Sequence, residues 1–185
     1  CRRRLGLPPR YVLCVGAIEP RKNVLTVLRA FADLPAAVRE ACPLVLAGPW
    51  GWKSEPERAF FEATARPLGA LHLGYVSAAD LPAVYGGATA LLYPSHYEGF
   101  GLPPVEMLAC GGAVVCSTAA GAVREVVGRH AALIDANDVA GWRDVLRQAA
   151  TEPEWVAELR RGGAAHAARF TWVRSARETA AVYRN

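Results

Sequence analysis

The sequence has no hydrophobic run long enough to cross a membrane. Its longest apolar stretches, such as Tyr11–Ile18 and Thr89–Tyr93, are far shorter than the ~18–20 residues that a spanning helix needs. Nothing at the amino terminus resembles a signal peptide. We therefore expect a soluble, cytoplasmic protein, with peripheral association at the inner face of the membrane as an alternative for the full-length protein.

Patterns typical of disulfides and metal sites are absent as well. The cysteines are odd in number, form no C-x-x-C pair and lie mostly in apolar runs, which indicates reduced, buried thiols. They are Cys1, Cys14, Cys42, Cys110 and Cys116. The histidines are far apart and have no ligand spacing against cysteine or carboxylate, so we expect no metal site. They are His72, His96, His130 and His166.

Several catalytic and cofactor motifs are also missing. No G-x-G-x-x-G follows the first apolar run, which argues against a dinucleotide-dependent dehydrogenase. No G-x-S-x-G elbow surrounds Ser95, which argues against a serine hydrolase. The only lysines are Lys22 and Lys53, and neither lies in a setting suited to anchor pyridoxal phosphate.

What is present is the composition of one globular domain. The chain has 185 residues, of which 52% are apolar and 21% charged, enough for a single core. Its net charge of +4 suits a small anionic ligand as well as nucleic acid. The Arg2–Arg4 cluster predicts a solvated terminus, with an anionic surface or a domain contact as alternatives.

Short apolar runs alternate with stretches of helical spacing, which is typical of a parallel sheet with crossover helices. The runs are Tyr11–Ala17, Leu44–Ala47, Leu71–Tyr75, Thr89–Tyr93, Ala113–Ser117 and Ala131–Ile134. Because they are almost wholly apolar, we expect strands covered on both faces. The fold class predicted is therefore α/β: a Rossmann-like, doubly wound parallel sheet of about six strands with helices on both faces.

Helix signals fit this arrangement. Apolar residues recur at helical spacing from Val24 to Phe31, and Ser77 with Asp80 forms a capping box for a helix over Asp80–Gly86. A further helix is predicted over Pro103–Cys110, with prolines in its first turn and glycines after its end. The tail has no strand signal. It predicts three helices that close the fold, near Asp138–Ala150, Glu154–Arg169 and Trp172–Tyr183, with Thr171 as the last N-cap and the aromatic rings of Phe170 and Trp172 anchoring that helix.

Two polar loops follow the first and fourth predicted strands. They are residues 19–23 and residues 94–106. In the strand order 3-2-1-4-5-6, strands one and four are neighbours at the switch point, where ligands bind beyond the carboxyl ends of the strands. We therefore expect the two loops to face each other across one crevice.

The residue types in these loops suit a phosphate. Gly99 and Gly101 allow close backbone approach, and the amides of Phe100, Gly101 and Leu102 open a helix whose positive end attracts an anion. Arg21 and Lys22 would add the charge that holds a diphosphate. A solvated helix start is the alternative for this basic pair.

Two glutamates complete the predicted site. Glu106, expected in the first turn of the helix, can accept hydrogen bonds from ribose hydroxyls, or it can merely complement the helix dipole. Glu98, on the glycine-rich loop, would reach the other side of the phosphate and has no evident packing role.

The run from Glu98 to Glu106 resembles the E-x7-E motif of retaining glycosyltransferases of family 4, also called group 1, which have the two-domain GT-B fold. The similarity extends over nearly the whole chain through short segments. These are residues 15–16, 19–23, 46–48, 73–77, 93–95, 109–111 and 170–172. The chain is similar to the C-terminal, donor-binding half of such an enzyme, with residues 1–185 as one domain and the N-terminal acceptor domain absent.

The resemblance implies a role for each matching residue. Glu98 corresponds to the glutamate at the transferred sugar, Arg21 and Lys22 to the basic pair at the diphosphate, and Glu106 to the glutamate at the ribose. The catalytic set implied is Glu98, Arg21 and Lys22, and the donor-binding set is Glu106, Gly99, Phe100, Gly101, Leu102, Tyr75, Val76 and Gly16. Many family members have an arginine where this chain has Ala17, and Arg21 is expected to supply that charge.

The implied reaction moves a sugar from a nucleotide-diphosphate donor to a glycan or lipid-linked acceptor held by the missing domain, without nucleic acid, metal or other cofactor. Residues 19–23 are most similar to mannosyltransferases of surface polysaccharides, which favours GDP-mannose, with UDP-glucose open. The isolated fragment is expected to be inactive. The alternatives are a non-catalytic nucleotide-sugar-binding domain and a GT-B epimerase or phosphorylase.

Overall fold

Residues 3–184 are described in the computed structural model, and within them the chain forms a six-stranded parallel sheet. The strands are β1 (Val12–Val15), β2 (Leu44–Ala47), β3 (Leu71–His72), β4 (Ala90–Tyr93), β5 (Ala113–Ser117) and β6 (Ala132–Ile134). Their order is β3-β2-β1-β4-β5-β6, so the predicted strands and the predicted switch point between β1 and β4 are confirmed.

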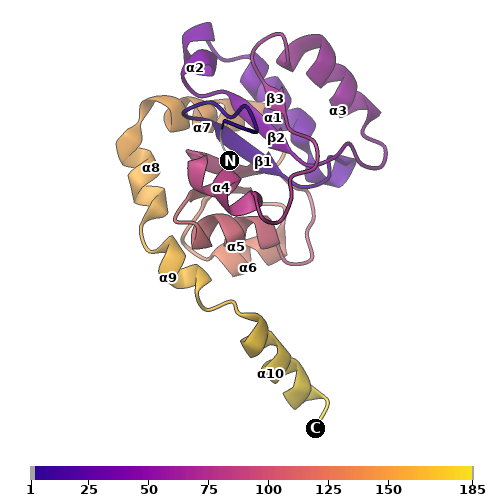
Figure 1. Cartoon of the computed structure of the whole chain (residues 1–185), viewed down its shortest axis with the longest axis vertical. Coiled ribbons are helices and arrows are strands. Elements are labelled where there is room, and N and C mark those ends of the chain that lie inside the picture. Colours follow the sequence, from indigo (N-terminus) through magenta and orange to yellow (C-terminus); the bar gives the residue numbers. More distant parts are fainter. Residues whose placement is uncertain (1–2, 185) are drawn as a thin grey trace.

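Helices connect the strands and form the tail (Figure 1). They are the 3-10 turn η1 (Pro20–Lys22), α1 (Val24–Ala32), α2 (Ala36–Ala41), α3 (Glu55–Phe60) with its continuation η2 (Phe61–Ala65), α4 (Leu81–Gly87), α5 (Leu102–Ala109), α6 (Gly121–Val127), α7 (Val139–Thr151), α8 (Pro153–Arg160), α9 (Gly163–Ala167) and α10 (Trp172–Val182). The Ser77 hydroxyl accepts from the amide of Asp80 at 3.2 Å, which confirms the predicted start of α4 to within one residue.

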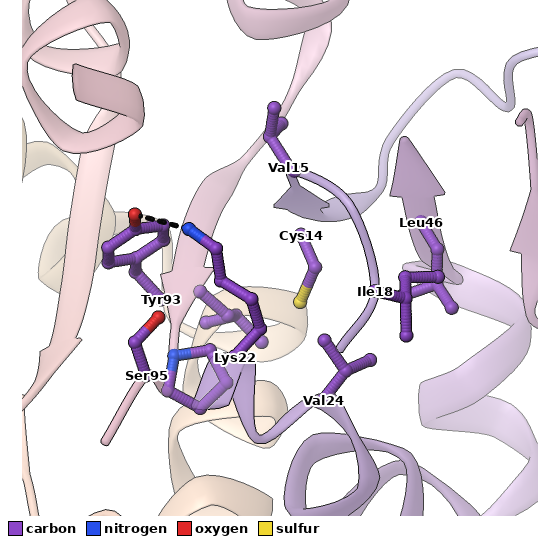
Figure 2. A pocket seen from close by; sticks show the side chains of 11 residues that line it. Cys14, Val15, Ile18, Lys22, Val24, Leu46, Tyr93 and Ser95 are labelled. Atoms are coloured by element: carbon purple, nitrogen blue, oxygen red, sulfur yellow. Dashed lines mark hydrogen bonds between the residues drawn. The ribbon is translucent and has the colours of Figure 1, made fainter. Parts of the chain in front are cut away.

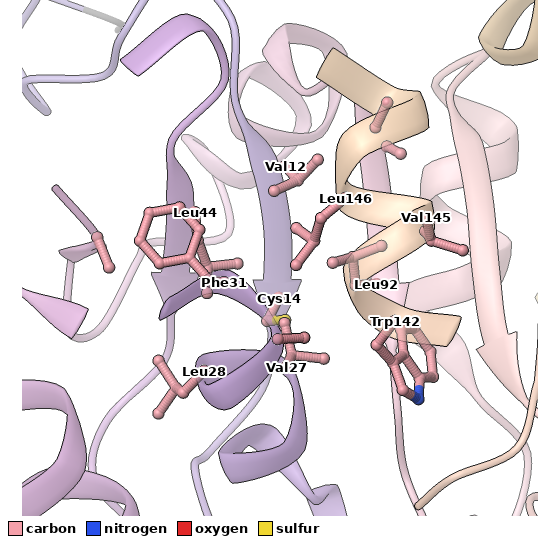
Figure 3. Packing of buried hydrophobic residues seen from close by; sticks show 14 of the residues in the cluster. Val12, Cys14, Val27, Leu28, Phe31, Leu44, Leu92, Trp142, Val145 and Leu146 are labelled. Carbon is pink, nitrogen blue, oxygen red and sulfur yellow. The ribbon is translucent and has the colours of Figure 1, made fainter. Parts of the chain in front are cut away.

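The sheet is covered on both faces, which is why nearly all positions of its strands are apolar. On one face, β1 presents Val12 and Cys14 to a core shared with α1 and α7 (Figure 3). On the other, Leu13 packs in a second core with residues of α4, α5 and α6. The two helices that follow the predicted site loops, α1 and α5, therefore pack in separate apolar cores on opposite faces of the sheet.

The tail differs from the prediction. Gly162, at a φ of 75°, separates α8 from α9, so the expected middle helix is broken in two. Thr171 is confirmed as the N-cap of α10, since its hydroxyl accepts from the Arg174 amide at 3.1 Å. However, α10 has no buried residue, its Trp172 is 80% exposed, and it extends away from the body of the domain (Figure 1). The expectation that three helices close the fold, with Trp172 as an anchor, is therefore wrong.

Other expectations concern the cysteines and the amino terminus. Cys14, Cys42 and Cys116 are buried and free, and burial raises the pKa of the Cys14 thiol to about 12, whereas Cys110 is exposed. Cys1 and Arg2 lie outside the described residues. Arg4 forms an ion pair with Asp80. Among the helices formed by residues 3–184, none is long and apolar enough to cross a bilayer.

Candidate functional site

The loops after β1 and β4 meet as predicted, and Asn23 holds them together. Asn23 adopts a left-handed conformation, φ 53°, between η1 and α1, and asparagine tolerates this better than most residues. Its buried amide donates to the carbonyl of Pro94 at 3.1 Å and to that of Ala136 at 2.7 Å. A backbone bond from the His96 amide to the Arg21 carbonyl, 2.8 Å, adds a second link. The two loops therefore form one rigid edge at the switch point.

Glu98 lies between the two cations of the other loop. Its Oε1 is 2.7 Å from the Nζ of Lys22, and its Oε2 is 3.0 Å from Nη1 of Arg21. Lys22 also donates to the hydroxyl of Tyr93 at 2.8 Å (Figure 2). The side chains of Glu98 and Lys22 are only 8% and 12% exposed, whereas that of Arg21 is 45% exposed and has Glu19 as a second partner at 2.8 Å.

These contacts set the ionisation of the cluster. Burial raises the pKa of Glu98, but the neighbouring hydrogen-bond donors, Lys22 first, and the charge of Lys22 together outweigh it, so its pKa lies below its usual value. Burial and the neighbouring Glu98 charge raise the pKa of Tyr93. At neutral pH the cluster therefore contains two cations, Arg21 and Lys22, balanced by two carboxylates, Glu98 and Glu19.

The amino terminus of α5 lies directly after this cluster. Gly101, its N-cap, has a φ of 99°, and a Cβ there would lie 2.8 Å from Cγ2 of Val123, so both conformation and space require glycine. Gly99 and Phe100 are exposed on the loop, and Leu102 begins the helix half-exposed. The Phe100 ring packs edge-on against Phe170 at 5.9 Å. The predicted amides thus stand at the positive end of α5.

Glu106 lies in the second turn of α5, one turn later than predicted, because the helix begins at Leu102. Beyond the first turn the helix dipole acts weakly, which disfavours the dipole interpretation of this carboxylate. The Tyr85 hydroxyl, from α4, donates to its Oε2 at 2.7 Å. The carboxylate is therefore positioned on the side of α5 that faces α4.

Of the remaining predicted donor-binding residues, Gly16 adjoins the ionic cluster, since a Cβ there would lie 3.6 Å from Nζ of Lys22, whereas Tyr75 and Val76 lie outside it. Gly16 follows β1 at a φ of 126°. Tyr75 is 80% exposed and Val76 half-buried after β3, which lies on the far side of β2 and β1 from β4. Gly48 joins these loops, since its amide donates to the Gly74 carbonyl at 2.7 Å.

The structure adds residues that the sequence analysis did not select. Tyr93 and Tyr85 form hydrogen bonds with Lys22 and Glu106 of the predicted site, and Asn23 joins the loops. Asn23 carried a signal, since asparagine directly after Arg21-Lys22 suits a left-handed turn. Tyr93 entered the sequence analysis only as part of a predicted strand and of the matching segment 93–95, and Tyr85 carried no signal, because its partner is distant in sequence. Of the two tryptophans that follow β2, Trp50 packs on Phe61 and His72, and Trp52 is 68% exposed.

The cavity beneath Lys22 is too small for a ligand. It lies between β1 and β4 and has a volume of about 10 Å³, room for about one water. Its walls include Cys14, Tyr93 and Ser95 (Figure 2). This cavity therefore has no room for a ligand of the predicted kind. Residues 3–184 contain no group of three or more histidine, cysteine or carboxylate side chains placed to hold a metal ion.

Comparison with known proteins agrees with this geometry. The family model described as "Glycosyl transferases group 1" matches residues 2–166. The chain is 37% identical over 174 residues to O-antigen chain mannosyltransferase B of Escherichia coli, covering 94% of this chain and 45% of that protein. It is 35% identical over 195 residues to D-inositol 3-phosphate glycosyltransferase of Salinispora arenicola, covering 98% and 43%. The chain thus spans less than half the length of these relatives.

Solved structures show the same fold. Sucrose-phosphate synthase from Thermosynechococcus elongatus superposes with a TM-score of 0.81 at 25% identity, over 99% of this chain and 47% of that one. HepE of Anabaena, solved in complex with UDP and glucose, superposes with a TM-score of 0.82 at 20% identity, over 98% and 50%. The chain belongs to the group 1 glycosyl transferase family and has the fold of its C-terminal GT-B domain.

Proposed function

We propose that this domain binds the nucleotide-diphosphate sugar of a retaining glycosyltransferase, and that the acceptor is held by a separate N-terminal domain. The observation that carries the proposal is the pairing of Arg21 and Lys22 with Glu98 at the amino terminus of α5. Two cations and a helix end suit a diphosphate, and a nearby carboxylate suits sugar hydroxyls. The length of the relatives, about twice that of this chain, supports the second domain.

Each residue of the predicted site has its own role in binding the donor. Arg21 and Lys22 hold the diphosphate and stabilise the charge that develops as it leaves, with the α5 amides beside them. Glu98 accepts from the transferred sugar, and Glu106, held by Tyr85, accepts from the ribose. Gly16 lets the backbone approach the phosphates closely, and the Tyr75–Val76 segment forms the wall beside the base.

Mannose is the sugar that we propose, because several relatives are mannosyltransferases. Besides the O-antigen enzyme, the serotype-specific mannosyltransferase WbdA of Escherichia coli is 34% identical over 94% of this chain. GDP-mannose is accordingly the first donor to test, and UDP-glucose the second, since HepE was solved with UDP-glucose. We place the reaction in the cytoplasm, at the inner membrane face, where a lipid-linked acceptor would be reached.

A calorimetric panel of GDP, UDP, ADP and their sugar conjugates against the 185-residue chain tests donor binding. We expect at least one nucleotide sugar to bind, and to bind equally well in EDTA, because the positive charge comes from Arg21, Lys22 and the α5 amides. No binding by any ligand would contradict the proposal, and binding lost in EDTA would contradict its metal-free form. Transfer is tested in the full-length protein: binding without transfer or hydrolysis would indicate a non-catalytic module.

Glu106→Gln is expected to weaken nucleotide-sugar binding by about 1–3 kcal/mol, the worth of hydrogen bonds to a charged acceptor. Titration calorimetry with the best ligand of the panel measures it. Glu62→Gln, which removes an exposed carboxylate of η2 paired with Arg66, is the matched control and should leave affinity unchanged. Equal affinities for Glu106→Gln and the wild type would remove Glu106 from the ribose site.

A further inference from the structure

The cations proposed to hold the diphosphate already have an anionic partner. Glu98 contacts both of them, with one carboxylate oxygen on Lys22 at 2.7 Å and the other on Arg21 at 3.0 Å. In this arrangement the carboxylate occupies the positions from which two phosphate oxygens would accept hydrogen bonds. A diphosphate that approaches the site therefore competes with a side chain of the protein itself.

Glu98 is not free to move far from these cations. Its side chain is 8% exposed, and the preceding loop is tied to the Arg21 backbone by the bond from His96, 2.8 Å. The Arg21 guanidinium also approaches the Tyr97 carbonyl at 3.4 Å. When a diphosphate binds Lys22 and Arg21, the Glu98 carboxylate therefore stays close to it. The carboxylate then repels the negatively charged phosphates and has lost contacts with its own cations.

We propose that Glu98 makes the site discriminate between the donor and the free nucleoside diphosphate that remains after transfer. This inference rests on the proposed function. An intact donor carries a sugar whose hydroxyls can donate to Glu98 and replace the lost cation contacts. The free diphosphate has no such donor, so its phosphates face an unsatisfied carboxylate. The carboxylate thus favours release of the product and retention of the donor.

Removing this charge should change the two affinities unequally. In Glu98→Gln the amide has nearly the same shape but releases both cations, so we expect GDP and UDP to bind roughly tenfold more tightly or better. The nucleotide sugar gains less, because its hydroxyls lose a charged acceptor. The ratio of donor affinity to product affinity therefore falls several-fold.

Calorimetry of the 185-residue chain with GDP, GDP-mannose, UDP and UDP-glucose tests this inference. Glu19→Gln is the matched control, since it removes an equal charge beside Arg21 but leaves the Lys22–Glu98 pair intact, and its affinity ratio should match that of the wild type. Thermal unfolding verifies that each variant is folded. If Glu98→Gln does not fold, Glu98→Asp, whose shorter side chain weakens the contacts, is expected to tighten product binding to a lesser degree.

The outcomes separate the inference from the function on which it rests. If the wild type binds none of the ligands, the proposed function fails and this inference with it. If the wild type binds but Glu98→Gln leaves product affinity unchanged, weakens it, or shifts donor and product equally, the function stands and the inference is overturned. If Glu98→Asp is used in its place, the inference is overturned by the same outcomes: product affinity that is unchanged or weaker, or an equal shift for donor and product.

Discussion

Gly48→Ala is expected to lower the free energy of unfolding by about 3–5 kcal/mol, in the upper range for a single substitution. A Cβ at this position would lie 2.1 Å from the carbonyl oxygen of Gly16 and 2.5 Å from its carbonyl carbon. The clash is with backbone atoms of Gly16, so no side-chain rotation relieves it. The φ of 142° adds strain for any residue with a side chain.

Urea unfolding followed by circular dichroism measures this loss. Gly69→Ala is the matched control, because Gly69 also has a positive φ, 99°, but an added Cβ meets nothing within 4 Å. We expect that variant to lose about 1–2 kcal/mol, the cost of the left-handed conformation alone. If both variants lost the same stability, the close approach of the loops after β1 and β2 would not be a feature of the folded protein. Since Gly16 is displaced by the clash, Gly48→Ala should also weaken nucleotide binding.

Lys22→Met should weaken nucleotide-sugar binding by about 2–5 kcal/mol, because it removes a nearly buried cation from the proposed diphosphate site. The same change leaves the buried Glu98 carboxylate with Arg21 as its remaining ion-pair partner, and Arg21 is half-exposed. We therefore expect a loss of stability of about 1–3 kcal/mol at neutral pH as well.

The loss of stability has a defined pH dependence. In the wild type the pKa of Glu98 is lower in the folded state than in the unfolded chain, so the ionised carboxylate contributes stability above its ordinary pKa. That contribution disappears as the pH falls through the folded-state pKa. The stabilities of the wild type and Lys22→Met should therefore converge in acid. Unfolding curves measured across this pH range would contradict the argument if the difference stayed constant.

The double variant Lys22→Met/Glu98→Gln is the control for this explanation. When Glu98 is already replaced by glutamine, no buried carboxylate loses its partner. The Lys22→Met change should therefore lower the stability less in this background than it does as a single variant. Nucleotide-sugar binding should stay well below that of Glu98→Gln, because the cation itself is missing. Recovery of binding in the double variant would show that Lys22 acts only by holding Glu98.

Much of the fold could be predicted from local patterns. Strands such as Leu44–Ala47 and Ala113–Ser117 are apolar on both faces, and a parallel sheet with crossover helices is the architecture that buries them. The site loops could be predicted for a related reason. Once β1 and β4 are neighbours, the segments after them have to lie together, which brings Arg21 and Lys22 close to Glu98.

The predictions for the helical tail are wrong where local sequence signals are weak or misleading. Residues 154–169 are rich in helix formers, which favour one helix over the weaker break signal of the pair Gly162-Gly163, where Gly163 lies close to Leu108 of α5. The last helix has helical periodicity, but periodicity does not specify what covers the apolar side. In this chain no residue of α10 is buried, although its apolar periodicity resembles that of a packed helix.

By itself the sequence determined the class of fold, the helix caps at Ser77 and Thr171, and, given the usual strand order of such sheets, the group of charged residues at the switch point. These depend on periodicity and on residues a few positions apart. Only the tertiary structure decided that Glu98 pairs with both cations, that Tyr93 and Tyr85 hold Lys22 and Glu106, and that Asn23 bridges two loops. Those contacts join residues far apart in the chain, and side-chain distances of 3 Å or less follow from the packing of whole elements, which no local pattern specifies.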